Sequence, residues 1–390
     1  MESYKSEPSE PANVDLMPCP HRPPCAACPR YAEFGISAVA HEALDRLARE
    51  HGLLKLAVIA GAPSQFRLRA RLAIRGRVGS PKIGVFQTDS HRVVHIPNCV
   101  IHHPLINHVA SVTRGVIADL GVSCFSDSAH LGLARYLQIV VERSSQTAQV
   151  VLVGNSPNAV PAGACLDELR ARLGGELHSL WFNSNTERAN TILGPKFEHR
   201  CGPQSVVERF GGAEVHYPPG AFGQSNLDVA QKLIDHVRSL IPAGAAVVEF
   251  YAGVGAIGLS LLDKISALTA NEMSPQSLLG LDLGISRLSP ADRDKVRLVP
   301  GKAGSRAGEL VAGQVVIADP PRKGLDAELV AVLREKPPQR FIYVSCGLES
   351  FLRDTVLLTS LGQLKLTALS VFDMMPYTDH VETVACFDAV

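Results

Sequence analysis

The hydrophobic pattern of the C-terminal half consists of short, uninterrupted apolar runs separated by segments whose apolar positions recur at helical spacing. Parallel strands that are buried on both faces have such continuous apolar runs, and their alternation with helices is typical of a doubly wound α/β domain. We expect this Rossmann-like domain to span residues 206–390. Its predicted strands are residues 246–250, 266–271, 296–299, 315–318 and 341–344.

The N-terminal half has a mixed pattern. Apolar positions recur at helical spacing over residues 31–52, the chain from 64–95 alternates as strands do, and residues 104–119 have the pattern of another helix. We therefore expect a smaller α+β domain over residues 19–205. Residues 1–18 are polar, contain prolines and show no periodicity, so we expect a flexible arm there.

The composition is that of a globular protein. The chain has 390 residues, of which 46% are hydrophobic and 19% are charged, and it is longer than one ordinary core requires. No apolar run reaches the roughly 20 residues that a membrane helix needs, and the N-terminus lacks the basic and apolar regions of a secretory signal. We therefore expect a soluble, cytoplasmic protein, and a monomer.

The formal net charge of +0 excludes a global electric field that would attract nucleic acid. A basic surface must then be local, and five nearly alternating arginines are its obvious source, because alternate side chains of a strand share one face. The same pattern is equally typical of an ordinary solvated strand face. These arginines are Arg67, Arg69, Arg71, Arg75 and Arg77.

The nine cysteines are better interpreted as metal or catalytic ligands than as disulfides in a cytosolic chain. Cys19, Cys25 and Cys28 form a C-x5-C-x2-C cluster among prolines, and Cys99 is the most plausible fourth ligand. Four thiolates suit an iron–sulfur cluster or a structural zinc. Because the spacing is not the paired C-x2-C of a zinc ribbon, it favours iron–sulfur over zinc, with a metal-free loop as the third alternative. We expect the cysteines without spaced partners to be small core residues, namely Cys124, Cys165, Cys201 and Cys386.

The first predicted strand of the C-terminal domain leads into a glycine-rich turn, with Gly253, Gly255 and Gly258 in G-x-G-x-x-G spacing. Such a turn lets the backbone approach a nucleotide-like ligand closely, but enzymes that use NAD and enzymes that use adenosylmethionine share it. Glu272 ends the second strand, where either class binds ribose hydroxyls. The turn therefore predicts a nucleotide-like cofactor without choosing between them.

Three further elements carry candidate chemistry. Asp319-Pro320-Pro321-Arg322 follows the fourth strand, and a D-P-P turn there is typical of adenosylmethionine-dependent methyltransferases that act on nucleic-acid bases, although a plain turn is the alternative. Cys346 ends the fifth strand and is either a nucleophile or an inert core thiol. Glu382 opens an otherwise apolar strand, so its carboxylate is expected to face the site or to form a structural ion pair.

Together these elements resemble the RNA 5-methyluridine methyltransferase family, which uses S-adenosyl-L-methionine to methylate C5 of uridine in ribosomal or transfer RNA. The resemblance covers nearly the whole chain, and the cysteine pattern is similar to that of the iron–sulfur subset. The matching segments are Phe222–Asn226 for the F-x-Q-x-N element, Tyr251–Gly258 for the cofactor loop, Asp319–Arg322 for D-P-P-R, Val344–Gly347 for the nucleophile motif and Asp373–Glu382 for the base-bearing loop.

The resemblance implies a role for each matching residue. Cys346 is implied to add to C6 of the uracil ring as the nucleophile, and Glu382 to remove the C5 proton as the base. The target base must be single-stranded or flipped, and Phe222 is a candidate to stack on it. The residues implied to bind S-adenosyl-L-methionine are Gln224, Tyr251, Glu272 and Asp319, to which we add Gly253 and Gly255 of the glycine-rich turn. The residues implied to hold a [4Fe-4S] cluster are Cys19, Cys25, Cys28 and Cys99.

The chain also departs from the family pattern. Many members carry an N-terminal barrel module, and the residues before the cysteines are too few for one, so we expect no such module here. We therefore expect the central domain to bind the RNA, with ribosomal RNA favoured over transfer RNA. Gly347-Leu348 replaces the usual Asn-Pro after the nucleophile, Ala256 replaces a polar residue, and Lys302 stands where members often place Asn or Asp. Two alternatives follow. One is an RNA-binding iron–sulfur protein with an inactive methyltransferase domain, and the other is a methyltransferase for an exocyclic amine, which would not need Cys346.

Overall fold

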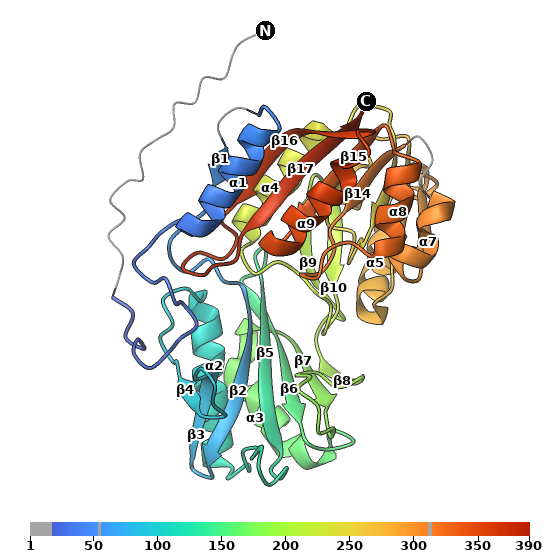
Figure 1. Ribbon diagram of the computed structural model, residues 1–390. Helices are drawn as coiled ribbons and strands as arrows, with labels where there is room; N and C mark the ends of the chain where they lie inside the picture. Colours follow the sequence, from blue (N-terminus) through green and yellow to red (C-terminus); the bar gives the residue numbers. More distant parts are fainter. Residues whose placement is uncertain (1–17, 54–55, 311–313) are drawn as a thin grey trace.

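Two β-sheets organise the chain in the computed structural model, which describes residues 18–53, 56–310 and 314–390. A larger sheet lies in the upper half of Figure 1 and a smaller one in the lower half. Apart from Pro18, the arm expected at residues 1–18 lies outside the described residues. None of the described helices has the length and apolarity that crossing a bilayer requires.

The larger sheet is mixed and has eight strands. In sheet order they are β1 (Ala57–Ile59), β16 (Leu364–Phe372), β17 (Glu382–Ala389), β15 (Arg340–Ser345), β14 (Val315–Ala318), β11 (Ala246–Phe250), β12 (Ala267–Glu272) and β13 (Val296–Pro300). Strands β11 to β15 are parallel to their neighbours within that group, which confirms the predicted strands of the C-terminal half. Strand β17 runs antiparallel between β15 and β16.

Helices cover both faces of the larger sheet. One face carries α1 (Ala38–Glu50), α7 (Ala303–Leu310), α8 (Ala327–Glu335) and α9 (Leu348–Thr359), and the other carries α4 (Leu227–Leu240), α5 (Pro275–Arg287) and the short η3 (Gly258–Leu261), with α6 (Pro290–Arg293) following α5. Because strand side chains alternate, Val248 and Phe250 pack in the core of the first face while Val247 packs in the core of the second. The doubly wound α/β prediction is therefore confirmed.

The smaller sheet has seven strands. In sheet order they are β4 (Val93–His95), β3 (Ser80–Phe86), β2 (Arg69–Arg77), β5 (Ala134–Glu142), β6 (Thr147–Gly154), β7 (Leu177–Ser184) and β8 (Lys196–Cys201). Helices α2 (Pro104–Asp119) and α3 (Gly163–Leu173), the second flanked by the short turns η1 (Val160–Ala162) and η2 (Gly174–Glu176), share its hydrophobic core. The ribbon of β9 (Val206–Phe210) and β10 (Ala213–Tyr217) lies between the two sheets in Figure 1.

Two elements of the N-terminal half belong to the larger sheet. Strand β1 pairs in parallel with β16, with Ala57 opposite Ser370, and α1 packs on the same sheet. The division at residue 205 stays a prediction. The predicted helix at 31–52 begins only at Ala38, because the Ser37 hydroxyl caps it by accepting from the Ala40 amide at 3.2 Å.

The arginines of β2 are more buried than a solvated strand face would be. Arg75 is 6% exposed and pairs with Asp127 at 2.7 Å, and the Arg69 guanidinium lies 4.1 Å from the centre of the Tyr217 ring. The solvated-face alternative is therefore wrong for Arg75. Arg71 is exposed and lines the large cavity described below.

Candidate active site

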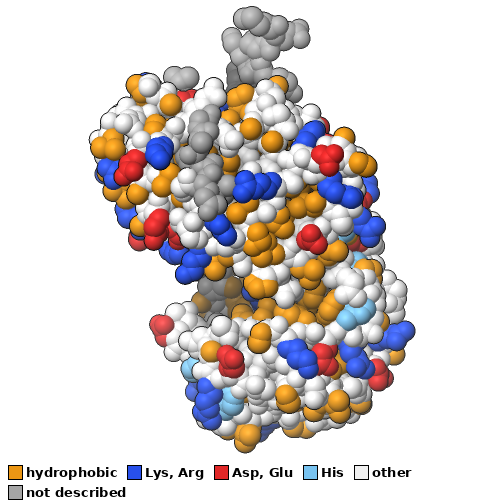
Figure 2. All heavy atoms as spheres, turned by 90° about the vertical axis from the view of Figure 1, so that its right-hand side faces the viewer, with side chains coloured by type: hydrophobic (Ala, Val, Ile, Leu, Met, Phe, Trp, Pro, Cys, Tyr) orange, Lys and Arg blue, Asp and Glu red, His pale blue; other side chains and the backbone are white. Residues whose placement is uncertain are grey.

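The carboxyl ends of β11, β12, β14 and β15 meet at one edge of the larger sheet, where a cavity of about 760 Å³ opens. Figure 2 shows hydrophobic side chains gathered where the upper and lower lobes meet. The predicted site residues that line this cavity are Gln224, Tyr251, Gly253, Glu272, Asp319, Cys346 and Glu382. Gly255 does not line it; with φ +84° it packs so closely on Leu281 and Leu259 that a side chain there would collide with them.

Cys346 reaches the cavity because β15 ends just before it. Strand β15 is buried from Phe341 to Ser345 and lies between parallel β14 and antiparallel β17. After Ser345, which pairs with Thr383, the chain leaves the sheet and turns into α9. The half-buried Cys346 thiol therefore stands at the sheet edge, on the wall of the cavity.

Glu382 approaches the same cavity from the neighbouring strand. It is the first residue of β17, lies opposite Phe372 of β16 and is 4% exposed. Its Oε1 is buried without a hydrogen-bond partner among the described residues. A buried carboxyl oxygen without a partner is costly, and here it lines a cavity that can admit a ligand.

Three acidic groups of the cavity have raised pKa values. Burial, together with the nearby Glu382 and Asp319 carboxyls, raises the pKa of the Cys346 thiol to about 12, and Arg322 partly opposes this. Burial and Asp319 hold the pKa of Glu382 well above its usual range. Burial raises the pKa of Asp319 to about 7. Burial makes it costly for these groups to carry negative charge. A positively charged ligand beside them lowers that cost, so the site favours such a ligand.

Glu272 and Tyr251 shape the glycine-rich loop. Glu272 Oε2 accepts a hydrogen bond from the Gly253 amide at 2.8 Å, and its Oε1 accepts from the amides of Met273 and Ser274. Since a carboxylate has about four acceptor positions, Glu272 keeps capacity for ligand hydroxyls. Tyr251 adopts a left-handed conformation with φ +58°, and its hydroxyl accepts from the Asp326 amide at 3.0 Å.

Glu249 is a cavity residue that the sequence analysis missed. It is the penultimate residue of β11, is 2% exposed and accepts a hydrogen bond from the Gly258 amide at 3.2 Å through Oε1. Its Oε2 has no hydrogen-bond partner among the described residues, and burial raises the pKa of the Glu249 carboxyl to about 8. An acidic residue inside an otherwise apolar strand next to a glycine-rich loop was the signal available in the sequence.

The departure at Gly347 has a steric reason. A Cβ atom at this position would lie 2.6 Å from the Arg322 carbonyl oxygen and 2.6 Å from the Ser350 hydroxyl. The Ser350 hydroxyl donates to that same carbonyl at 2.9 Å. The D-P-P-R turn therefore lies directly against the turn after Cys346, and only glycine permits this approach.

The other two departures differ in position. Ala256 lines the cavity, so the polar side chain that family members usually have at this position is absent from the cavity wall. Lys302 is exposed and does not line the cavity. The Lys302 departure therefore changes no described wall of the candidate cofactor site.

The four predicted metal ligands line a second cavity of about 120 Å³, and they are Cys19, Cys25, Cys28 and Cys99. Burial raises the pKa of the Cys28 thiol to about 12, and the other three thiols add to this shift. Across the described residues, no group of three or more His, Cys, Asp or Glu side chains is arranged to hold a metal ion. Four thiols around one cavity do have the donor chemistry of an iron–sulfur or zinc site.

Comparisons with known proteins agree with this geometry. A family model described as tRNA (uracil-5-)-methyltransferase matches residues 308–389, which include Cys346 and Glu382. An uncharacterised RNA methyltransferase of Protochlamydia amoebophila is 33% identical over 384 residues, covering 97% of this chain and 99% of the relative. An uncharacterised RNA methyltransferase of Geobacter sulfurreducens is 30% identical, covering 87% of this chain and 70% of the relative.

A solved structure has the same fold. It is the tRNA (uracil-54, C5)-methyltransferase of Pyrococcus abyssi in complex with S-adenosyl-L-homocysteine, with a TM-score of 0.73 and 22% identity, covering 90% of this chain and 83% of that chain. Since the sequence relationship extends over nearly the whole chain, this protein belongs to the RNA (uracil-5-)-methyltransferase family, whose enzymes take their methyl group from S-adenosyl-L-methionine.

Proposed function

We propose that this protein methylates C5 of uridine in RNA through a covalent bond between Cys346 and C6 of the target base. The observation that carries the proposal is the placement of a thiol and an unpartnered carboxyl on one cavity, at the ends of two paired strands. Uracil C5 is a poor nucleophile, so a group must first add to C6. Methylation of an exocyclic amine needs no such thiol.

S-adenosyl-L-methionine, when bound, supplies the methyl group on a positively charged sulfonium. The residues that we expect to hold it are Gln224, Tyr251, Gly253, Glu272 and Asp319, all of which line the cavity. Glu272 is suited to accept hydrogen bonds from ribose hydroxyls. The loop amides hold its carboxylate in place and leave an acceptor position free. A cationic ligand beside the buried carboxyls lowers the cost of ionising them, so these acids favour a positively charged cofactor.

Cys346 acts first in the proposed sequence. Its thiol proton passes to Asp319 in the carboxylate form, a group whose charge acts on the sulfur, while Arg322 stabilises the thiolate. The sulfur electron pair forms the bond to C6, and the C5–C6 π electrons move to C5 and O4 as an enolate. With S-adenosyl-L-methionine bound, C5 would take the methyl group, S-adenosyl-L-homocysteine would leave, and C5 would keep one proton that must be removed.

Glu382 completes the sequence. Glu382 first releases its own proton to solvent, and its Oε1 then removes the C5 proton. The C5–C6 double bond forms again, and the C6–S bond breaks to return the thiolate, which recovers the proton held by Asp319. A buried carboxylate with a raised pKa is a stronger base than an exposed one, and a pKa near the working pH is best for proton transfer. The free acceptor position on Oε1 is consistent with this role.

The substrate that we propose is ribosomal RNA, with transfer RNA as the second candidate, and the enzyme acts in the cytoplasm as a monomer. Phe222 lines the cavity yet is 67% exposed, so its ring is free to stack on a base that has left its helix. Mapping 5-methyluridine in both RNA classes from a strain that lacks the gene identifies the substrate.

We also propose that the four cysteines hold a [4Fe-4S] cluster. Their thiols surround one cavity, and the C-x5-C-x2-C spacing is not the paired C-x2-C of a zinc ribbon. Anaerobically purified protein is expected to show the broad visible absorption of such a cluster and to contain iron and sulfide. Colourless protein that contains zinc instead would contradict this assignment.

The methylation proposal is tested with purified enzyme and RNA, followed by mass spectrometry of the nucleosides. Cys346→Ala is expected to lower turnover by several orders of magnitude while S-adenosyl-L-methionine still binds. Cys124→Ala is the matched control, because it removes a half-buried thiol outside both cavities. Wild-type turnover in Cys346→Ala, or a methyl group on an exocyclic amine, would refute the proposal.

A further inference from the structure

The loop between β16 and β17 forms a wall shared by the two cavities. We call residues 373–381 the base loop, because Glu382 follows it directly. Met374, Met375 and His380 line the large cavity, while Met375, Pro376 and Thr378 line the cysteine cavity. Only a few positions of the base loop separate the residues that line the two cavities. A displacement on the cysteine side is therefore expected to move the side that faces Cys346.

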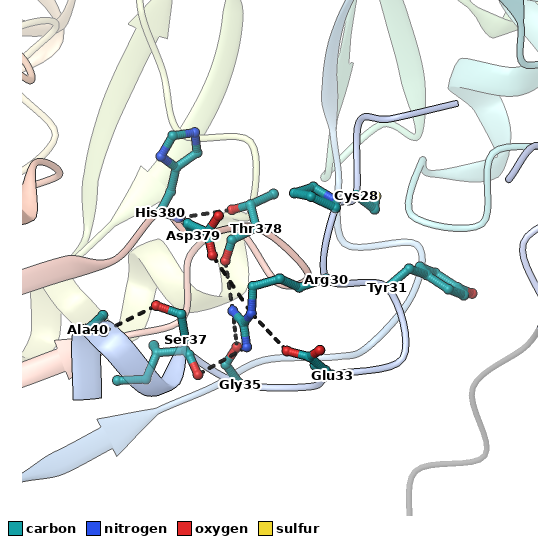
Figure 3. Close-up of polar contacts among 12 residues, drawn as sticks. Cys28, Arg30, Tyr31, Glu33, Gly35, Ser37, Ala40, Thr378, Asp379 and His380 are labelled. Atoms are coloured by element: carbon teal, nitrogen blue, oxygen red, sulfur yellow. Dashed lines mark hydrogen bonds and ion pairs between the residues drawn. The ribbon is translucent and has the colours of Figure 1, made fainter. Parts of the chain in front are cut away.

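Arg30 ties the base loop to the segment that carries the cysteines (Figure 3). Its Nη1 donates to the Thr378 carbonyl at 2.9 Å and to the Gly35 carbonyl at 3.2 Å, and its Nη2 donates to the Ile36 carbonyl at 3.1 Å. The Arg30 amide donates to the Tyr377 carbonyl at 3.0 Å. The side chain is only 13% exposed, so one guanidinium joins backbone carbonyls that are distant in sequence.

Acidic side chains complete the surroundings of Arg30. Its Nε donates to Glu33 at 3.2 Å and lies 3.9 Å from Asp379. With these contacts, four of the five guanidinium N–H groups have acceptors in the described structure, and the planar fork sets their directions. A lysine ammonium has no such fork and is expected to replace only part of this arrangement.

Tyr377 anchors the middle of the base loop. It is 0% exposed, its hydroxyl donates to the Pro63 carbonyl at 2.7 Å, and its ring centre lies 5.0 Å from that of Tyr31. Cys28 and Cys99 pack against the same hydrophobic cluster. Its left-handed φ of +67° is unusual for a residue other than glycine and is retained because the surroundings determine it.

The base loop continues from this anchor to Glu382. The His380 amide donates to the Thr378 hydroxyl at 3.2 Å, and the His380 ring lies 3.0 Å from the Arg322 guanidinium. Sheet pairing fixes the backbone of Glu382 itself, but the preceding residues close the cavity beside its side chain. Loosening the base loop would admit water and change the direction from which the carboxyl faces the target base.

We infer that Arg30 is a positioning residue for the proton-removal step. By joining the base loop to residues 19–37 it holds Glu382 ready to take the C5 proton, so the state of the cysteine segment affects this step and leaves the addition of Cys346 unaffected. This inference rests on the proposed function. Loss of Arg30 is expected to stall the enzyme after methyl transfer, with RNA still bonded to Cys346.

The test measures covalent enzyme–RNA complexes on denaturing gels alongside turnover. Arg30→Ala is expected to lower turnover about 10- to 100-fold, to accumulate adduct toward the level of Glu382→Gln, and to keep the wild-type visible spectrum and cofactor affinity. Arg30→Lys is expected to be intermediate, and it carries the test if Arg30→Ala does not fold. Arg22→Ala is the matched control, since Arg22 donates to the carbonyls of Cys28 and Pro29 at 2.9 Å and, within the described structure, makes no hydrogen bond to the base loop.

The outcomes separate this inference from the proposed function. If Glu382→Gln accumulates adduct while both Arg30 variants remain at the level of Arg22→Ala, the positioning role is overturned and the covalent mechanism stands. If the Arg30 variants lose turnover without accumulating adduct, the positioning role is also overturned, because such a loss indicates a general effect on folding. If the wild type makes no 5-methyluridine and Glu382→Gln forms no adduct, the proposed function itself fails.

Discussion

Replacing Glu249 by glutamine should remove a pH-dependent loss of stability. The carboxyl is 2% exposed under the glycine-rich loop, and its burial raises the pKa from 4.5 to about 8. Below pH 4.5 both the folded and the unfolded chain hold this proton. Between pH 4.5 and about 8 the unfolded chain releases it while the folded chain retains it, so stability falls as the pH rises.

The size of this effect follows from the shift. The difference between 4.5 and about 8 is roughly 3.5 units, and each unit corresponds to about 1.4 kcal/mol. Glu249 therefore costs the folded protein up to about 5 kcal/mol at pH 8 relative to a group that does not ionise. Glutamine has nearly the same shape and keeps an acceptor oxygen for the Gly258 amide.

Unfolding of both proteins across pH 5 to 9 measures the difference, by heat or by urea. The stability of Glu249→Gln relative to the wild type is expected to increase with pH and to level off near pH 8. Asp263→Asn is a control without a pH trend in this range, because the hydrogen bond from Arg238 lowers the pKa of Asp263 below its ordinary 3.8, so this carboxyl stays ionised in both states above pH 5. A difference between Glu249→Gln and wild type that does not change with pH would refute the burial argument.

Three further predictions concern the loops and the cysteines. Gly347→Asn introduces the usual family residue, and its Cβ would lie 2.6 Å from the Arg322 carbonyl oxygen. This collision should reduce turnover in single-turnover assays, and wild-type turnover would contradict the steric explanation. Gly258→Ala should press on the Glu249 carboxyl and weaken cofactor binding in calorimetry, and unchanged affinity would show that the loop can shift. Cys99→Ser should lose the visible absorption of the cluster, whereas an intact spectrum would remove Cys99 from the ligand set.

Strand ends of the C-terminal half could be predicted because parallel strands buried on both faces leave apolar runs that stop where the chain reaches the sheet edge. Asp319 and Cys346 each follow such a run, so the sequence placed both at one edge, and the structure brings them onto one cavity. The three residues of β1 gave no comparable signal, because so short a parallel strand is defined only by its partner β16.

Contacts between distant segments could not be predicted in this way. Arg75 is buried because Asp127 and three aromatic rings surround it, and none of these partners is marked by local spacing. The contact between Arg30 and Thr378 spans 348 positions of the chain. Hydrophobic periodicity reports which face of an element is buried, but not which remote loop covers it.

The central claim is that Cys346 bonds to RNA and that Glu382 releases the product. The most direct measurement is a denaturing gel, with mass spectrometry of the trapped species, after Glu382→Gln is incubated with RNA and S-adenosyl-L-methionine. The account predicts a protein–RNA complex that carries the transferred methyl group and disappears when Cys346→Ala is added to the same chain. Absence of this complex under conditions where the wild type methylates the RNA would contradict the account.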